Sequence, residues 1–144
     1  MSLAEKTLQK ARIVHAAFFL TSILYMLIPM VAFKTQTKEV RPAIILAISF
    51  VAVSDMGMGI LYRNKFFPPL TEALARNLDD AAASRKWFIG VVRSFVFCEM
   101  TILFGLALRI LGTRWNISGL FFIAGILLLL AWTPKLDLPS STSS

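Results

Sequence analysis

Four long apolar runs, separated by short charged segments, set the pattern of the chain. They cover residues 13–33, 42–62, 87–108 and 115–132, and the first and last contain no Lys, Arg, Asp or Glu. At about 1.5 Å per residue, runs of this length approach or match the roughly 30 Å hydrocarbon core of a bilayer. The pattern therefore predicts four transmembrane helices joined by short connections.

The connections carry local helix signals of their own. Ser2 and Glu5 have the spacing of a capping box, which predicts that a helix begins there and continues into the first span. After the prolines at 68–69, apolar residues recur at helical spacing, which predicts a short interfacial helix between the second and third spans. The acidic pair at 79–80 is placed to cap the start of the third span.

These elements define the expected fold class. We predict an all-α polytopic membrane protein, with residues 1–135 forming a single four-transmembrane-helix bundle. Residues 136–144 are rich in serine and are predicted to be a disordered tail. No part of this plan leaves room for a separate soluble domain.

Composition narrows the functional classes. Hydrophobic residues make up 57% of the chain and charged residues 16%, which excludes an ordinary soluble globular protein. Cys98 is the single cysteine and His15 the single histidine, so a disulfide framework, a multi-cysteine metal site and bis-histidine haem ligation are excluded. We interpret His15 as a hydrogen-bonding residue. No cofactor fingerprint or nucleophile–base set is recognisable, so we expect no enzyme activity, cofactor, metal or nucleic-acid partner.

The distribution of lysine and arginine predicts the orientation. On one side the N-terminal segment carries three of these residues, the 63–86 connection five and the tail one, which makes nine. The other side carries five. Because positive residues accumulate in cytoplasmic loops, we predict that both termini are cytoplasmic and that the protein is integral to a plasma (inner) membrane.

Two ionisable residues within the spans are predicted to pair. Asp55 in the second span and Arg93 in the third are expected at matching depths on adjacent helices. An ionised side chain inside a bilayer is costly unless it is paired. We predict a structural ion pair between Asp55 and Arg93 that joins the two spans.

Glu99 is the leading functional candidate. It lies near the expected bilayer midplane with no basic residue at its level, so burial favours its protonated form. Tyr25, Ser49 and Thr101 are expected at a similar depth and complete a candidate ion or proton site. The carboxyl group is then either a passive hydrogen-bond donor between helices or a site that exchanges protons or binds a small cation.

Small residues mark predicted helix contacts. Gly57 and Gly59 lie in the second span, and Gly119 and Gly125 lie in the fourth. Glycines in membrane helices permit close approach of backbones. We interpret all four as helix-packing positions.

The segment around Glu99 resembles a known family. Residues 98–106, Cys-Glu-Met-Thr-Ile-Leu-Phe-Gly-Leu, place a carboxylate before an apolar stretch with a glycine. This resembles the ion-carrying helix of the rotary ATP synthase proteolipid, subunit c. The resemblance implies that Glu99 binds and releases a proton or sodium ion. The second span is not glycine-rich, and the carboxylate lies on the third span rather than the fourth, which departs from the pattern of that family.

Two functions fit these features of the sequence. The first is a structural or accessory subunit that packs in a membrane complex, in contact with the lipid bilayer and with copies of itself or other subunits. The alternative is a proton- or cation-handling protein that uses Glu99. A small-molecule carrier would require oligomerisation, because four helices rarely enclose a path.

Overall fold

The computed structural model describes residues 1–32 and 40–136, and its regular secondary structure there is entirely helical. The predicted all-α fold class is confirmed. Apart from Leu136, which is buried, the predicted tail lies outside the described residues, and so does Phe33. The helical elements are α1 Leu3–Ala32, α2 Pro42–Leu61, the π-helical turn η1 Tyr62–Phe66, α3 Phe67–Arg76, α4 Ala81–Ile110 and α5 Trp115–Ala131.

Three of the helical segments are long and apolar enough to cross a membrane. They are α1, the continuous segment Pro42–Arg76 and α4. The fourth predicted span forms α5, which is apolar but has 17 residues and rises about 25 Å. The four predicted long helices are thus all present, and three of them have the length of a full span.

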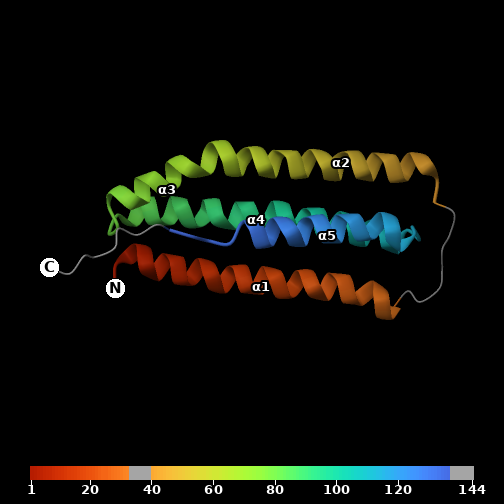
Figure 1. Cartoon of the computed structure of the whole chain (residues 1–144), viewed down its shortest axis with the longest axis horizontal. Helices are drawn as coiled ribbons and strands as arrows, with labels where there is room; N and C mark the ends of the chain where they lie inside the picture. The colour runs from red at the N-terminus through yellow and green to blue at the C-terminus, as the bar shows by residue number, and fades with distance from the viewer. Residues whose placement is uncertain (33–39, 137–144) are drawn as a thin grey trace.

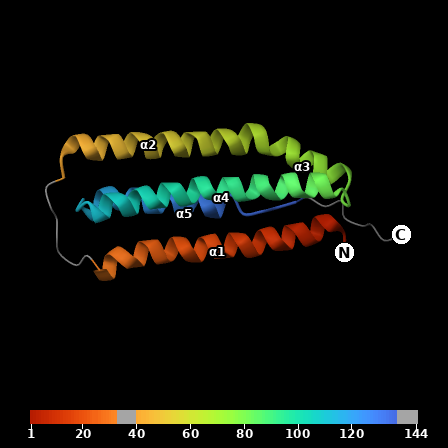
Figure 2. The same ribbon diagram turned by 180° about the vertical axis from the view of Figure 1, so that it is seen from behind.

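Helix α4 is the centre of the molecule. It packs against α1, α2, α3 and α5, and its buried residues run along its whole length. Figures 1 and 2 show α1 and α2 on opposite sides of α4, with α1 running parallel to α4 and α2 antiparallel to it. The start of α1, the start of α4 and helix α3 lie at one end of the bundle, which we call the α3 end.

The N-termini of α1 and α4 are capped as the sequence predicts. The Ser2 amide donates to the Glu5 carboxylate at 2.7 Å, and the Glu5 amide donates to the Ser2 hydroxyl at 3.2 Å, so the capping box forms. The Asp80 carboxylate accepts from the amides of Ala82 and Ala83. These contacts satisfy amides that have no partner inside the helix.

The prolines determine the shape of the segment that joins α2 to α3. Pro68 and Pro69 have no N–H, so the carbonyls of Asn64 and Lys65 lose their usual donors four residues ahead. The chain adopts a π-helical turn there, in which the Phe67 amide donates to the Tyr62 carbonyl. The predicted short helix after the prolines is confirmed as α3, but it continues from α2 instead of standing alone.

The α4–α5 connection is a tight turn built on glycine. Gly112 has a φ of 100°, the left-handed conformation in which a Cβ atom is unfavourable. The Thr113 amide then donates to the Leu108 carbonyl, and the buried Arg109 guanidinium donates to the Thr113 carbonyl at 2.8 Å. These bonds supply donors to carbonyls at the end of α4. The turn also directs α5 back along α4.

Helix α5 stops before it reaches the α3 end. One of its last carbonyls, that of Leu129, lies 2.9 Å from Nε2 of His15, which must donate because a carbonyl only accepts. The hydrogen-bonding role predicted for His15 is confirmed. Beyond α5, Trp132, Pro134 and Leu136 are buried in an extended segment that continues toward the α3 end (Figure 1).

Candidate functional site

Contacts between α2 and α4 fix which residues share a level. A Cβ atom on Gly59 would lie 2.8 Å from Cβ of Phe97, so these two positions are directly opposed. The helices are antiparallel, and four residues back along α2 therefore corresponds to four residues forward along α4 (Figure 1). Asp55 lies level with Thr101, close to the level of Glu99.

The structure does not bring Asp55 and Arg93 together. Arg93 lies eight positions before Thr101 in the sequence, which is about 12 Å along the helix. Its side chain is on the exposed side of α4, whereas Asp55 lies on the partly buried side of α2 with Ala52 and Gly59. Neither forms an ion pair within residues 1–32 and 40–136, and Oδ2 of Asp55 is buried without a hydrogen-bond partner there.

The predicted Asp55–Arg93 pair is wrong for a specific reason. The prediction measured depth from the ends of the apolar runs, whereas α4 begins at Ala81, six residues before its run, and α2 continues past the end of its run through η1. The ends of the apolar runs therefore do not mark equal depths on α2 and α4. The face of each helix also decides contact, and sequence depth alone contains no information on the face.

Glu99 has a partner that was not predicted from the sequence. The Ser22 hydroxyl on α1 lies 3.0 Å from Oε2 of Glu99, and Ser22 is fully buried. Thr101, by contrast, donates to the Phe97 carbonyl on its own helix. Among the hydrogen bonds of the described residues, Tyr25 and Ser49 make none to Glu99. Of the predicted cluster, only Glu99 makes a hydrogen bond between helices within the part of the chain that the structure describes.

The hydrogen bonds of Ser22 bear on whether the Glu99 carboxyl group carries a proton. The Ser22 hydroxyl also lies 2.8 Å from the carbonyl of Phe18, which can only accept. A hydroxyl has one proton, so it cannot fully donate to both oxygens at once. If Ser22 donates to Phe18, the contact with Oε2 is a full hydrogen bond only when the Glu99 carboxyl is protonated and donates. If Ser22 donates to Glu99 instead, the same contact suits an ionised carboxylate, so the geometry accommodates either protonation state.

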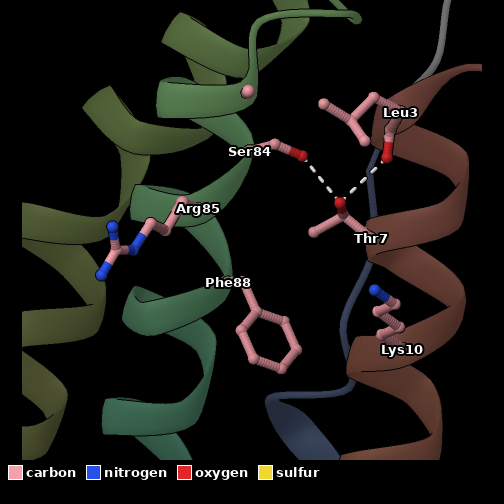
Figure 3. Close-up of a pocket in the computed structure, with 7 residues that line it drawn as sticks. Leu3, Thr7, Lys10, Ser84, Arg85 and Phe88 are labelled. Atoms are coloured by element: carbon pink, nitrogen blue, oxygen red, sulfur yellow. Dashed lines mark hydrogen bonds between the residues drawn. The ribbon is translucent and has the colours of Figure 1, made fainter.

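A second polar contact lies on the same pair of helices. Thr7 on α1 and Ser84 on α4 have their hydroxyl oxygens 2.7 Å apart, and Thr7 also donates to the Leu3 carbonyl (Figure 3). The separation in sequence is 77 for this pair and 77 for Ser22 and Glu99. The alignment of α1 along α4 is therefore the same at both contacts. This alignment brings Ser22 beside Glu99.

The glycines divide into two environments. A Cβ on Gly59 or Gly125 would collide with the neighbouring helix, so the packing role predicted for these two is supported by direct contact. For Gly57 and Gly119, no atom of another described part of the chain lies within 4 Å of such a Cβ. Gly105, which was not predicted as a packing position, lies against the backbone of Ser118.

Comparison with known proteins adds no relative. No protein-family model, curated protein or solved structure matches the chain. Within residues 1–32 and 40–136, no group of three or more His, Cys, Asp or Glu side chains is arranged to hold a metal ion. The function must therefore be inferred from the geometry of the chain itself.

Proposed function

We propose that this protein is a structural or accessory subunit of a membrane complex, which packs the outer faces of its helices against partner helices. The observation that carries the proposal is the outer face of α2. Ser54 and Gly57 are exposed there, and a Cβ on Gly57 would have no atom beyond its own helix backbone within 4 Å among the described residues. Glycine inside a helix costs about 1 kcal/mol relative to alanine. A partner helix that approaches closely at this point would offset that cost.

The surroundings of Gly57 support a contact inside the membrane. Phe50 is 76% exposed and Val53 57% exposed on the same helix. In a monomer these side chains would face only lipid. Large apolar side chains beside small residues form the knob-and-groove surface that membrane helices use for association.

A substitution pair tests this proposal. We expect Gly57→Leu to remove the partner while the fold is kept, because the added side chain meets open space in the isolated chain. Gly119→Leu on α5 is the matched control, since its site is equally open. The measurement is native mass spectrometry of the complex extracted gently from its own membrane, with circular dichroism to verify helix content.

The outcomes separate clearly. Other proteins, or further copies of this chain, bound in fixed ratio to wild type and to Gly119→Leu but lost from Gly57→Leu support the proposal. A wild-type chain that is recovered alone, or two variants that retain the partner equally, would overturn it.

A second candidate function is proton or cation handling at Glu99, and the Ser22–Glu99 contact favours it. A protonated carboxyl that donates to a buried hydroxyl can lose its proton when the contact opens, and the resemblance of residues 98–106 to the proteolipid family implies the same role. For this function we expect Glu99→Gln to abolish proton flux into liposomes that contain the purified protein. Glu72→Gln, at an exposed site on α3, is the control. Equal flux for both variants excludes the transport role.

The proposed orientation has both termini on the cytoplasmic side of a plasma (inner) membrane. The structure supports it because the start of α1, the whole of α3 and the start of α4 meet at one end, so the cations of the N-terminal segment and of the 63–86 connection lie together (Figure 2). Such an accumulation is typical of a cytoplasmic face.

A further inference from the structure

A hollow of about 510 Å³ lies at the α3 end, between the α2–α3 junction and the segment that follows α5. The π-helical turn η1 forms part of its wall, and such turns occur frequently at functional sites. Its walls combine two cations, two aromatic rings and two neutral polar side chains. These residues are Arg63, Lys135, Phe67, Trp132, Asn64 and Thr71.

Arg63 has a donor that nothing in the described chain satisfies. Its guanidinium lies over the Phe67 ring, with Cζ 3.9 Å from the ring centroid, and the ring cannot serve the in-plane N–H groups. Nη1 is buried and has no hydrogen-bond partner within residues 1–32 and 40–136. The charge of Arg63 has no ion-pair partner among the described residues, and Arg63 lines the hollow, so an anion seated there would be attracted to it.

The charges around the hollow favour the same kind of ligand. Lys135 contributes a second cation from the segment after α5. Glu72 is the acidic residue of the lining, and its Oε2 lies 3.9 Å from Nη2 of Arg76 on the same helix. The lining therefore carries two cations and one carboxylate, which has a distant, exposed cation beside it on α3. The wall presents Arg63 and Lys135 to an incoming anion.

The aromatic and apolar surroundings identify the source of the anion. Trp132 is of a residue type that is common where hydrocarbon meets lipid headgroups, and Phe67 adds a second aromatic ring to the wall. Leu61, directly before η1, and Phe66, the last residue of η1, are exposed and apolar. Basic pockets between membrane helices on the cytoplasmic side bind phosphate-bearing headgroups. We propose that this hollow binds the phosphate headgroup of an anionic phospholipid, with Arg63 and Lys135 on the phosphate.

Another hollow at this end is less suited to an anion. It has a volume of about 280 Å³ and lies between α1 and α4, where Lys10, Arg85 and Phe88 line it (Figure 3). The hydroxyls of Thr7 and Ser84 there bond to each other, and the Arg85 guanidinium points away from them (Figure 3). Among the described residues that line it, this second hollow thus has no buried unsatisfied donor, in contrast to Nη1 of Arg63.

The test measures binding of defined lipids to the purified protein. Phosphatidylglycerol and phosphatidylcholine are titrated separately into the protein in neutral detergent, and native mass spectrometry counts the bound lipids. The variants are Arg63→Gln and Lys135→Gln. Lys65→Gln is the matched control, because it removes the same charge from η1 at an exposed residue that does not line the hollow.

We expect one saturable phosphatidylglycerol site, with affinity lowered about five- to tenfold by Arg63→Gln and by Lys135→Gln and unchanged by Lys65→Gln. Lys135 is exposed, so its substitution keeps the test valid even where Arg63→Gln unfolds the chain. Equal binding by all three variants, or by phosphatidylcholine and phosphatidylglycerol, overturns the proposal. Displacement of the lipid by millimolar inorganic phosphate, with equal binding of phosphate alone, assigns the hollow to free phosphate and also overturns it.

Discussion

At Gly125 the close approach of α4 and α5 leaves no room for a Cβ atom. A Cβ at this position would collide with Ile102 and lie 3.0 Å from the Cys98 carbonyl, which belongs to the backbone and cannot rotate away. We expect Gly125→Ala to lower the free energy of unfolding by about 1–3 kcal/mol. Gly119→Ala on the same helix should change it little or raise it by up to about 1 kcal/mol. Thermal unfolding in detergent measures both, and equal effects would show that α5 does not pack as described.

The residues that could be predicted from the sequence are those that act on near neighbours. The capping box of Ser2 and Glu5 and the cap by Asp80 involve groups no more than three residues apart, and both are confirmed. The partner of Glu99 could not be predicted, because Ser22 is 77 residues away and only the register of α1 on α4 brings it there. The apolar pattern predicts that two helices pack, but it does not determine their register along each other.

At the scale of one element, the start of α4 depends on a single side chain. Asp80 accepts from the amides of Ala82 at 2.8 Å and Ala83 at 3.1 Å. We expect Asp80→Ala to lower the free energy of unfolding by about 1 kcal/mol, because both amides lose their acceptor. Asp80→Asn keeps an oxygen in place and should cost clearly less. Denaturant unfolding distinguishes them, and an Asp80→Ala variant as stable as wild type would show that the cap does not stabilise the helix.

The α2–α3 segment shows where element prediction succeeds and where it fails. A helix after the prolines was predicted from apolar spacing and is present as α3. Its continuity with α2 was not predicted, because proline normally interrupts a helix. The π-helical turn keeps the helical segment Pro42–Arg76 continuous and places Arg63 against Phe67. The depths counted from the ends of the apolar runs failed for another reason, because the register of α2 on α4 places Gly59 opposite Phe97.

At the scale of the whole molecule, α4 determines the topology. Its 30 residues rise about 45 Å, which exceeds the roughly 30 Å hydrocarbon core, so its ends project from a bilayer or the helix tilts. Asn77 lies before α4 and Asn116 after it, and both side chains are exposed. If α4 crosses the membrane, these two residues lie on opposite sides.

Single cysteines at these positions test both crossing and orientation. In a Cys98→Ala background, we expect Asn77→Cys to react with a membrane-impermeant maleimide only in inverted vesicles, and Asn116→Cys only in intact cells, because the cations gather at the α3 end. Labelling of both from one side would show that α4 does not cross. The reverse pattern would keep the crossing and invert the orientation, which would place the headgroup hollow of Arg63 on the outer leaflet. The experiment therefore separates the arrangement of the helices from the rule that orients them.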